Sequence, residues 1–299
     1  METKSLPVIS LTTLAAIMGL SGCGTQRHLA NKPSVHSHSV LSGKPSPSAV
    51  PSSVTSLQRT RSSSNNHASS HSKNSSTVSF PPLVASILSH VQETTSAPLW
   101  GPTTLPRGNS AKTLSTPHSF SAQIFACPVA EPLNGPGVGQ SNCGAMVSIA
   151  ENFGSTRYPS DNAARTALQA VQPPAFVTDL SSHPRTTQLL PGGIPARRWF
   201  SGQTASSGTT IAVNWKEGDW TLWVYGGTGL WNTAVMVTTQ LQRYRLPPYP
   251  GILIVDAAPD GQHTSLTWLA GNVLYQAGAE HQSLHAIVIA SSMKKYSPS

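Results

Sequence analysis

Two aspartates and a histidine lie close together near the C-terminal end of the chain. They are Asp256, Asp260 and His263. A carboxylate that orients a histidine beside a serine nucleophile is the arrangement of many hydrolases. A simpler interpretation exists, because Pro259-Asp260-Gly261 is typical of a turn between two strands. We favour the turn, and these three residues remain the candidates for catalysis by a hydrolase.

Other patterns raise the question of metal or phosphate binding. His281 and His285 are four residues apart on an expected helix, so both could bind one metal ion. The glutamate of a zinc protease motif is missing and no third ligand is evident, which favours an ordinary polar helical turn. The glycines at 135, 137, 139 and 144 match neither a dinucleotide fingerprint nor a P-loop, and predict a constrained loop. The sequence therefore predicts no metal and no cofactor.

A cysteine at position 23 follows an apolar N-terminal segment. Residues 6–20 are apolar apart from a few hydroxyl side chains. The segment is too short and too interrupted for a membrane span of ~20 residues, and it fits the apolar part of a secretory signal. Ser21 and Gly22 are small enough to enter a peptidase cleft, and the thiol of Cys23 can form a thioether with diacylglycerol.

The run Leu20-Ser21-Gly22-Cys23 resembles the lipobox of bacterial lipoproteins, which signal peptidase II cleaves. The resemblance implies that residues 1–22 are removed and that Cys23 becomes the lipidated first residue. It also implies a cell-membrane protein on the extracytoplasmic face, held by a diacylglyceryl anchor with acyl chains such as palmitate. Two such chains anchor a protein stably, whereas one gives only marginal binding. The alternative is an ordinary signal peptide with a chance cysteine.

Residues 23–80 have the composition of a disordered tether. Ser, Pro, Thr, Asn and His dominate this stretch, and it has no sustained apolar period. Such a segment buries too little apolar surface to offset the entropy of the chain. A flexible coil of this length spans ~40 Å, which suits a stalk between a membrane and a distal domain.

Two further cysteines, Cys127 and Cys143, form an even pair once Cys23 carries lipid. An oxidising extracytoplasmic compartment favours a disulfide between them. The bridge would close a loop of 16 residues, worth ~3 kcal/mol of chain entropy. Two free thiols, one of them nucleophilic, are the alternative.

The chain carries few charges, and most of them are positive. Charged residues make up 10% of the chain, against about 25% in typical domains, and the net charge is +8 with neutral histidines. A basic exported domain could face anionic lipid, an anionic wall polymer, a glycan or another envelope protein. The scattered basic residues argue against nucleic acid. Few carboxylates also raise the hypothesis of an acidic habitat, because few ion pairs would be lost as the pH falls.

The residues from 81 to 299 are enough for one domain with a proper core. The pattern predicts a helix at 83–91 and an alternating strand at 119–126. Ser160 is the expected N-cap of a helix that ends before Pro173-Pro174. Further strands are expected at 175–180, 196–201 and 251–257.

The C-terminal third contains two diverged copies of one unit, at about 210–244 and 264–296. Each copy has a strand with a tryptophan, a glycine-containing turn, a returning strand and a helical stretch. Over about 205–299 this pattern resembles ββα repeat domains of exported Gram-positive lipoproteins of unknown activity. The expected class is α+β, an antiparallel sheet with helices mainly on one face.

Two aromatic residues in the first copy could form a binding surface. On the strand 220–225, Trp223 and Tyr225 alternate with Trp220, Leu222 and Val224, so the two sets point to opposite faces. If one face is open, Trp223 and Tyr225 could stack on sugar rings or on a peptide. If another element covers that face, both sets belong to the core.

The leading expectation is a non-enzymatic surface lipoprotein. Its distal domain would bind a wall component, a peptide or another envelope protein. An exported hydrolase of wall or peptide substrates is the second hypothesis, with Asp256, Asp260 and His263 as its candidates. A structural envelope or spore component is the third.

Overall fold

The computed structural model of the chain describes residues 78–140, 143, 151–202, 204–205, 208–258, 262–280 and 282–297. The predictions for the leader, for Cys23 and for the tether up to residue 77 lie outside the described residues. The described part belongs to one compact unit, which begins at His71.

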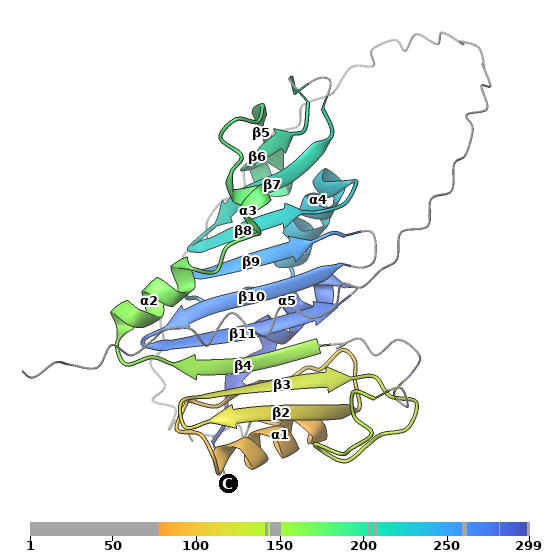
Figure 1. Cartoon of the computed structure of the whole chain (residues 1–299), viewed down its shortest axis with the longest axis vertical. Coiled ribbons are helices and arrows are strands. Elements are labelled where there is room, and N and C mark those ends of the chain that lie inside the picture. Colours follow the sequence, from red (N-terminus) through yellow and green to blue (C-terminus); the bar gives the residue numbers. More distant parts are fainter. Residues whose placement is uncertain are drawn as a thin grey trace, which may run out of the picture. The chain divides into compact units, whose positions relative to one another are not determined.

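Within the described residues, ten strands form one large sheet (Figure 1). In spatial order they are β2 (Ser110–Thr116), β3 (Ser119–Phe125), β4 (Glu151–Arg157), β11 (Val273–Glu280), β10 (His263–Ala270), β9 (Gly251–Asp256), β8 (Trp220–Tyr225), β7 (Thr210–Glu217), β6 (Ile194–Phe200) and β5 (Arg185–Leu190). Neighbouring strands are antiparallel except β8 and β9, which are parallel. A second, two-stranded sheet pairs β1 (Trp100–Pro102) with β12 (Met293–Lys295).

Helices cover one face of the large sheet more fully than the other (Figure 1). The main core lies under α1 (Pro82–Gln92), α4 (Leu230–Leu241) and α5 (Ser283–Ser292). Smaller apolar clusters on the opposite face lie under α2 (Asp161–Gln169) and α3 (Ala175–Thr178). A short 3-10 helix, η2 (Pro191–Gly193), joins β5 to β6. The arrangement confirms the α+β class with helices mainly on one face.

The two predicted copies are present, and each contains one more strand than the pattern indicated. The first runs β6-β7-β8-α4 and the second runs β9-β10-β11-α5. Gly218 and Gly271 occupy the two hairpin turns with φ of 58° and 62°, a region that favours glycine. Because α4 crosses over the sheet between the copies, β8 and β9 end up side by side and parallel.

Among the local predictions, α1 and β3 are confirmed, and so is the cap at Ser160. The Ser160 side chain accepts a hydrogen bond from the backbone N–H of Ala163 at 3.2 Å. The strand expected at 175–180 is wrong, because α3 begins after Pro174 and ends at Thr178. A short apolar run fits one helical turn as well as a strand, and proline is well tolerated at a helix start.

A row of aromatic side chains crosses the main core. Trp220, Trp268, Tyr275 and Trp100 follow one another with ring centroids 6.3, 5.7 and 5.2 Å apart. They come from both copies and from β1, so the row joins segments that are far apart in the sequence. Gly251 pairs with both Trp220 and Trp268 in the sheet, and the Trp220 ring lies against its backbone.

The two edges of the large sheet differ. Beside β2, the backbone N–H of Asn134 donates to Ala111 O, and Asn134 Oδ1 accepts from Thr113 N, so this side chain and its loop occupy the edge. At the other edge, every residue of β5 except Leu190 is exposed, and Leu189 retains 64% of its surface. One edge is thus capped and the other faces outward.

Among the residues that the structure describes, no helix combines the length and the apolarity needed to cross a bilayer.

Gly251→Ala tests the close contact within the aromatic row. A Cβ atom at this position would lie 2.7 Å from the Trp220 ring, too close for any side chain. We expect the free energy of unfolding to fall by about 1–3 kcal/mol, the usual cost of overpacking a core. Urea denaturation followed by tryptophan fluorescence measures the change, and equal stability of the variant would contradict the packing described.

Candidate functional site

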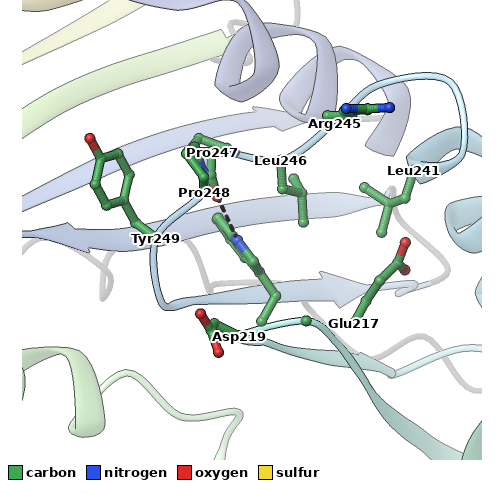
Figure 2. Close-up of a pocket in the computed structure, with 10 residues that line it drawn as sticks. Glu217, Asp219, Leu241, Arg245, Leu246, Pro247, Pro248 and Tyr249 are labelled. Carbon is green, nitrogen blue, oxygen red and sulfur yellow. Dashed lines mark hydrogen bonds between the residues drawn. The ribbon is translucent and has the colours of Figure 1, made fainter.

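A pocket of about 390 Å³ lies between the β7–β8 turn and the connector from α4 to β9 (Figure 2). Its lining residues come from three elements of the first copy and from that connector: Glu217, Gly218, Asp219, Trp220, Leu241, Arg245, Leu246, Pro247, Pro248 and Tyr249. The turn supplies two carboxylates, and the connector supplies prolines, an arginine and a tyrosine. The pocket therefore combines apolar walls with charged groups.

Hydrogen bonds hold the two walls of the pocket together. The indole N–H of Trp220 donates to the carbonyl oxygen of Pro247 at 3.0 Å (Figure 2). The backbone N–H of Tyr249 donates to the same oxygen at 2.8 Å, and Gly251 N donates to Asp219 O at 3.4 Å. Since proline also fixes φ within the connector, the walls are largely set before any ligand enters.

The pocket contains two carboxylates and one guanidinium, and these groups differ in how far they are buried. Asp219 and Arg245 are exposed, whereas Glu217 is half-buried and its Oε2 atom has no hydrogen-bond partner among the described residues. Burial raises the pKa of Glu217, and the Trp215 side chain offsets part of that shift. Figure 2 shows Glu217 near Leu241 and Arg245, with Asp219 nearer to Tyr249. The described residues show no ion pair among these three charged groups.

The sequence patterns did not predict this pocket. The turn at 217–219 and the connector at 246–250 lie about 30 residues apart, and each has a sufficient local explanation as turn chemistry or as a rigid linker. A usable signal was the tryptophan that directly follows the turn, because a buried indole N–H needs an acceptor. The proline-rich connector supplies that acceptor at Pro247.

The strands bring two of the three catalytic candidates side by side. Asp256 at the end of β9 pairs with His263 at the start of β10, while Asp260 lies outside the described residues. On its other side Asp256 pairs with Tyr225 of β8. Burial, the charge of Asp256 and a hydrogen bond to Asp256 together raise the pKa of Tyr225 to about 12. The carboxylate of Asp256 therefore serves as an acceptor for a buried tyrosine.

The aromatic pair Trp223 and Tyr225 points away from the main core, as the alternation predicts. They do not form an exposed platform together, because Tyr225 is only 6% exposed and packs edge-on against Phe176. Trp223 is half-buried and stacks on Trp199, with centroids 5.7 Å apart. The segment that contains α3 covers this part of the face, so of the two alternatives the covered one applies to Tyr225.

Of the two histidines considered for metal binding, His285 belongs to α5, and His281 lies outside the described residues. His285 Nδ1 lies 3.3 Å from Oε1 of Glu151, the first residue of β4. The described part of the chain contains no group of three or more His, Cys, Asp or Glu side chains that could hold a metal ion.

The Glu151 side chain is fully buried beside His285. Burial raises the pKa of Glu151, a backbone hydrogen bond and the positive charge of Arg107 offset part of the rise, and the resulting pKa is about 7. Burial lowers the pKa of His285, and the charge of Arg107 lowers it further. Both shifts favour the neutral forms, so this buried pair carries little charge over the range between the two pKa values.

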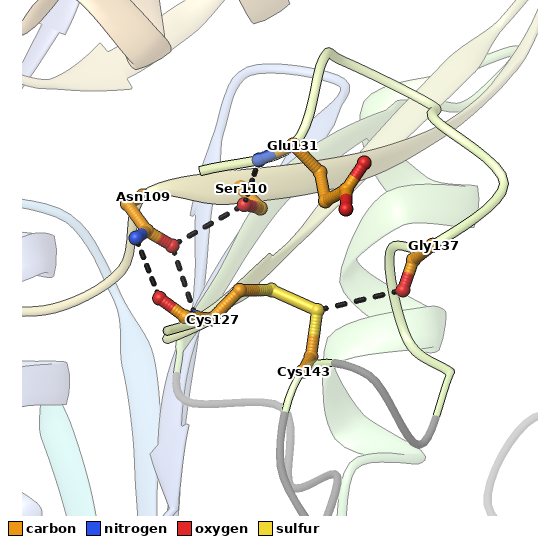
Figure 3. The surroundings of a disulfide bond; sticks show 6 residues. All are labelled: Asn109, Ser110, Cys127, Glu131, Gly137 and Cys143. Carbon is orange, nitrogen blue, oxygen red and sulfur yellow. Dashed lines mark hydrogen bonds between the residues drawn. A yellow bond between two sulfur atoms is a disulfide. The ribbon is translucent and has the colours of Figure 1, made fainter. Parts of the chain in front are cut away.

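The predicted disulfide between Cys127 and Cys143 is present (Figure 3). Asn109 holds both backbone groups of Cys127: its Nδ2 donates to Cys127 O at 2.7 Å and its Oδ1 accepts from Cys127 N at 2.9 Å. Cys143 Sγ lies 3.5 Å from Gly137 O. This is a van der Waals contact, because a disulfide sulfur carries no hydrogen. The bridge closes a loop that contains Gly135, Gly137 and Gly139 of the segment predicted to be constrained, and Gly144 follows Cys143 and lies outside the described residues.

Comparisons of the chain with known protein families, with curated proteins and with solved structures find no match. The chemistry of the pocket therefore has to be derived from its own residues.

Replacing both bridged cysteines tests the contribution of the disulfide. Cys127→Ser combined with Cys143→Ser should lower the free energy of unfolding by about 3 kcal/mol, because the unfolded chain regains the entropy of a 16-residue loop. Urea denaturation with and without reductant measures this. The reductant should weaken the wild type and leave the double variant unchanged, and a wild type insensitive to reduction would contradict the bridge.

Glu151→Gln should change how stability depends on pH. The Glu151 carboxyl ionises near its ordinary value of 4.5 when unfolded and near 7 when folded, so the wild type loses stability as the pH rises through this window. Glutamine removes that loss. We expect the free energy of unfolding at pH 7.5 to exceed that of the wild type by on the order of 1–3 kcal/mol, with no difference near pH 4.5.

His285 acts in the opposite sense, because its lowered pKa makes the folded state lose stability as the pH falls below its ordinary value of 6.5. The Glu151→Gln variant should therefore retain only this acid-side loss. Urea denaturation between pH 4.5 and 7.5 measures both, with the exposed Glu93→Gln as the matched control. A difference between Glu151→Gln and wild type that stays constant over this range would contradict the assignment.

Proposed function

We propose that this chain is an exported lipoprotein, anchored at the extracytoplasmic face of the cell membrane by a diacylglyceryl group on Cys23. Its folded domain is a binding module for a component of the cell envelope. The tether from residue 23 to about 80 gives this domain its reach from the membrane.

The pairing of Cys127 with Cys143 supports export. Disulfides persist in oxidising compartments and are rare in the cytosol. Since these two cysteines satisfy each other, the third cysteine of the chain, Cys23, remains for lipid attachment. This fits the small residues and the apolar segment that precede it.

The pocket is the observation that carries the binding function. Its walls are fixed by hydrogen bonds from Trp220 and Tyr249 to Pro247, and its lining combines apolar side chains with two carboxylates. A preformed concave site with a few polar groups is the usual form of a ligand site. Its volume of about 390 Å³ suits a side chain or a small portion of a polymer rather than a folded partner.

Cys23→Ala tests the anchor. In a bacterial host, the wild type should fractionate with membranes, and its mass should show loss of residues 1–22 and addition of a diacylglyceryl group at Cys23. The variant should lack the lipid mass, because alanine has no thiol to form the thioether. Ser21→Ala is the matched control, since it keeps a small residue beside the cleavage site. A Cys23→Ala protein with unchanged mass in the membrane fraction would contradict the proposal.

A further inference from the structure

We propose that the pocket binds an alkylammonium group carried on an apolar stem, as in the side chain of lysine or a related diamino acid. This inference rests on the proposed binding function and names the ligand class of the same site. The lining residues offer three kinds of contact that together select such a group: carboxylates, aromatic faces and aliphatic side chains.

The carboxylates favour a cation. Glu217 and Asp219 line the pocket together with one guanidinium, that of Arg245. Glu217 is half-buried and Asp219 is exposed, and both side chains line the pocket. An ammonium group brings three donors and a positive charge, so it can form charge-assisted hydrogen bonds with the carboxylates that line the pocket.

The apolar residues favour a stem rather than a bare ion. Leu241 and Leu246 provide aliphatic walls, and Trp220 and Tyr249 provide aromatic ones. Methylene groups gain free energy when they leave water and pack against such surfaces. An ammonium group near an aromatic face gains further attraction from the ring electrons. A small inorganic cation would use the carboxylates and leave the apolar walls unfilled.

Arg245 distinguishes two sources of the same chemistry. A free diamino acid carries an α-carboxylate, which the exposed guanidinium can bind at the rim (Figure 2). A residue within a peptide has no such group, so Arg245 contributes only repulsion toward its ammonium. Arg245→Ala should therefore weaken the binding of a free diamino acid and strengthen the binding of a residue within a peptide. Arg243→Ala is the control, because Arg243 does not line the pocket.

The test uses the exported chain carrying Cys23→Ala, titrated by isothermal calorimetry at low salt. The probes are Nα-acetyl-lysine methylamide, its uncharged analogue Nα-acetyl-norleucine methylamide, and free lysine. We expect the lysine amide to bind at least about tenfold more tightly than the norleucine amide. The reason is that the free energy of a hydrogen bond to a charged group corresponds to at least about a tenfold change in the dissociation constant. Glu217→Gln should remove most of this preference, and Glu93→Gln should leave it unchanged.

Binding of the lysine amide should also strengthen as the pH rises above 4.5, because burial raises the pKa of Glu217 above that ordinary value and the carboxyl is ionised only at higher pH. Should Glu217→Gln fail to fold, as judged by circular dichroism, the exposed Asp219→Asn carries the same comparison. Equal affinity for the two amides, or no measurable binding of lysine amide at millimolar concentration, would overturn the inference. Binding of envelope fragments that is insensitive to Glu217→Gln would overturn the ligand class alone. An unchanged mass of the Cys23→Ala protein in the membrane fraction would contradict the lipid anchor alone, and that outcome is independent of both results above.

Discussion

The aromatic row in the main core ties the domain together. Trp220 belongs to the first copy, Trp268 and Tyr275 to the second, and Trp100 to the strand that precedes the sheet. Each ring contacts the next, with centroid distances between 5.2 and 6.3 Å. The same Trp220 donates its indole N–H to Pro247 and lines the pocket. The shape of the candidate site is thus fixed by the packing that joins the two copies, and it would not survive their separation.

Much of the fold followed from local patterns. Alternation, glycine turns and a serine cap predicted β3, the two hairpins, α4, α5 and the start of α2, because each signal lies within one element. The prediction of a strand at 175–180 was wrong, because the segment forms the four-residue helix α3. An apolar run this short has no periodicity that distinguishes a strand from a helix. The large sheet itself depends on pairings between distant segments, such as β4 with β11, which no local pattern contains.

The site was less predictable than the fold. Alternation along β8 correctly predicted that Trp223 and Tyr225 point to the same face of the sheet. It could not predict the segment that covers this face, because that segment comes from a different part of the chain. Asp256 and His263, weak catalytic candidates that are close in the sequence, are paired across β9 and β10, and Asp256 also has a tyrosine partner that the sequence pattern does not reveal. The buried Glu151 and the pocket at Glu217 arise from tertiary burial, which determines their pKa shifts and which sequence neighbours do not reveal.

The unequal edges of the sheet limit how this domain can associate with itself. Asn134, in the loop that the disulfide closes, caps β2, so among the described residues the large sheet offers a further strand its β5 edge. Two copies that met through their β5 strands would leave a capped edge at each end of the combined sheet. Such an association closes at two chains and cannot propagate into a fibre. The difference between the two edges thus protects an otherwise extended sheet from runaway polymerisation.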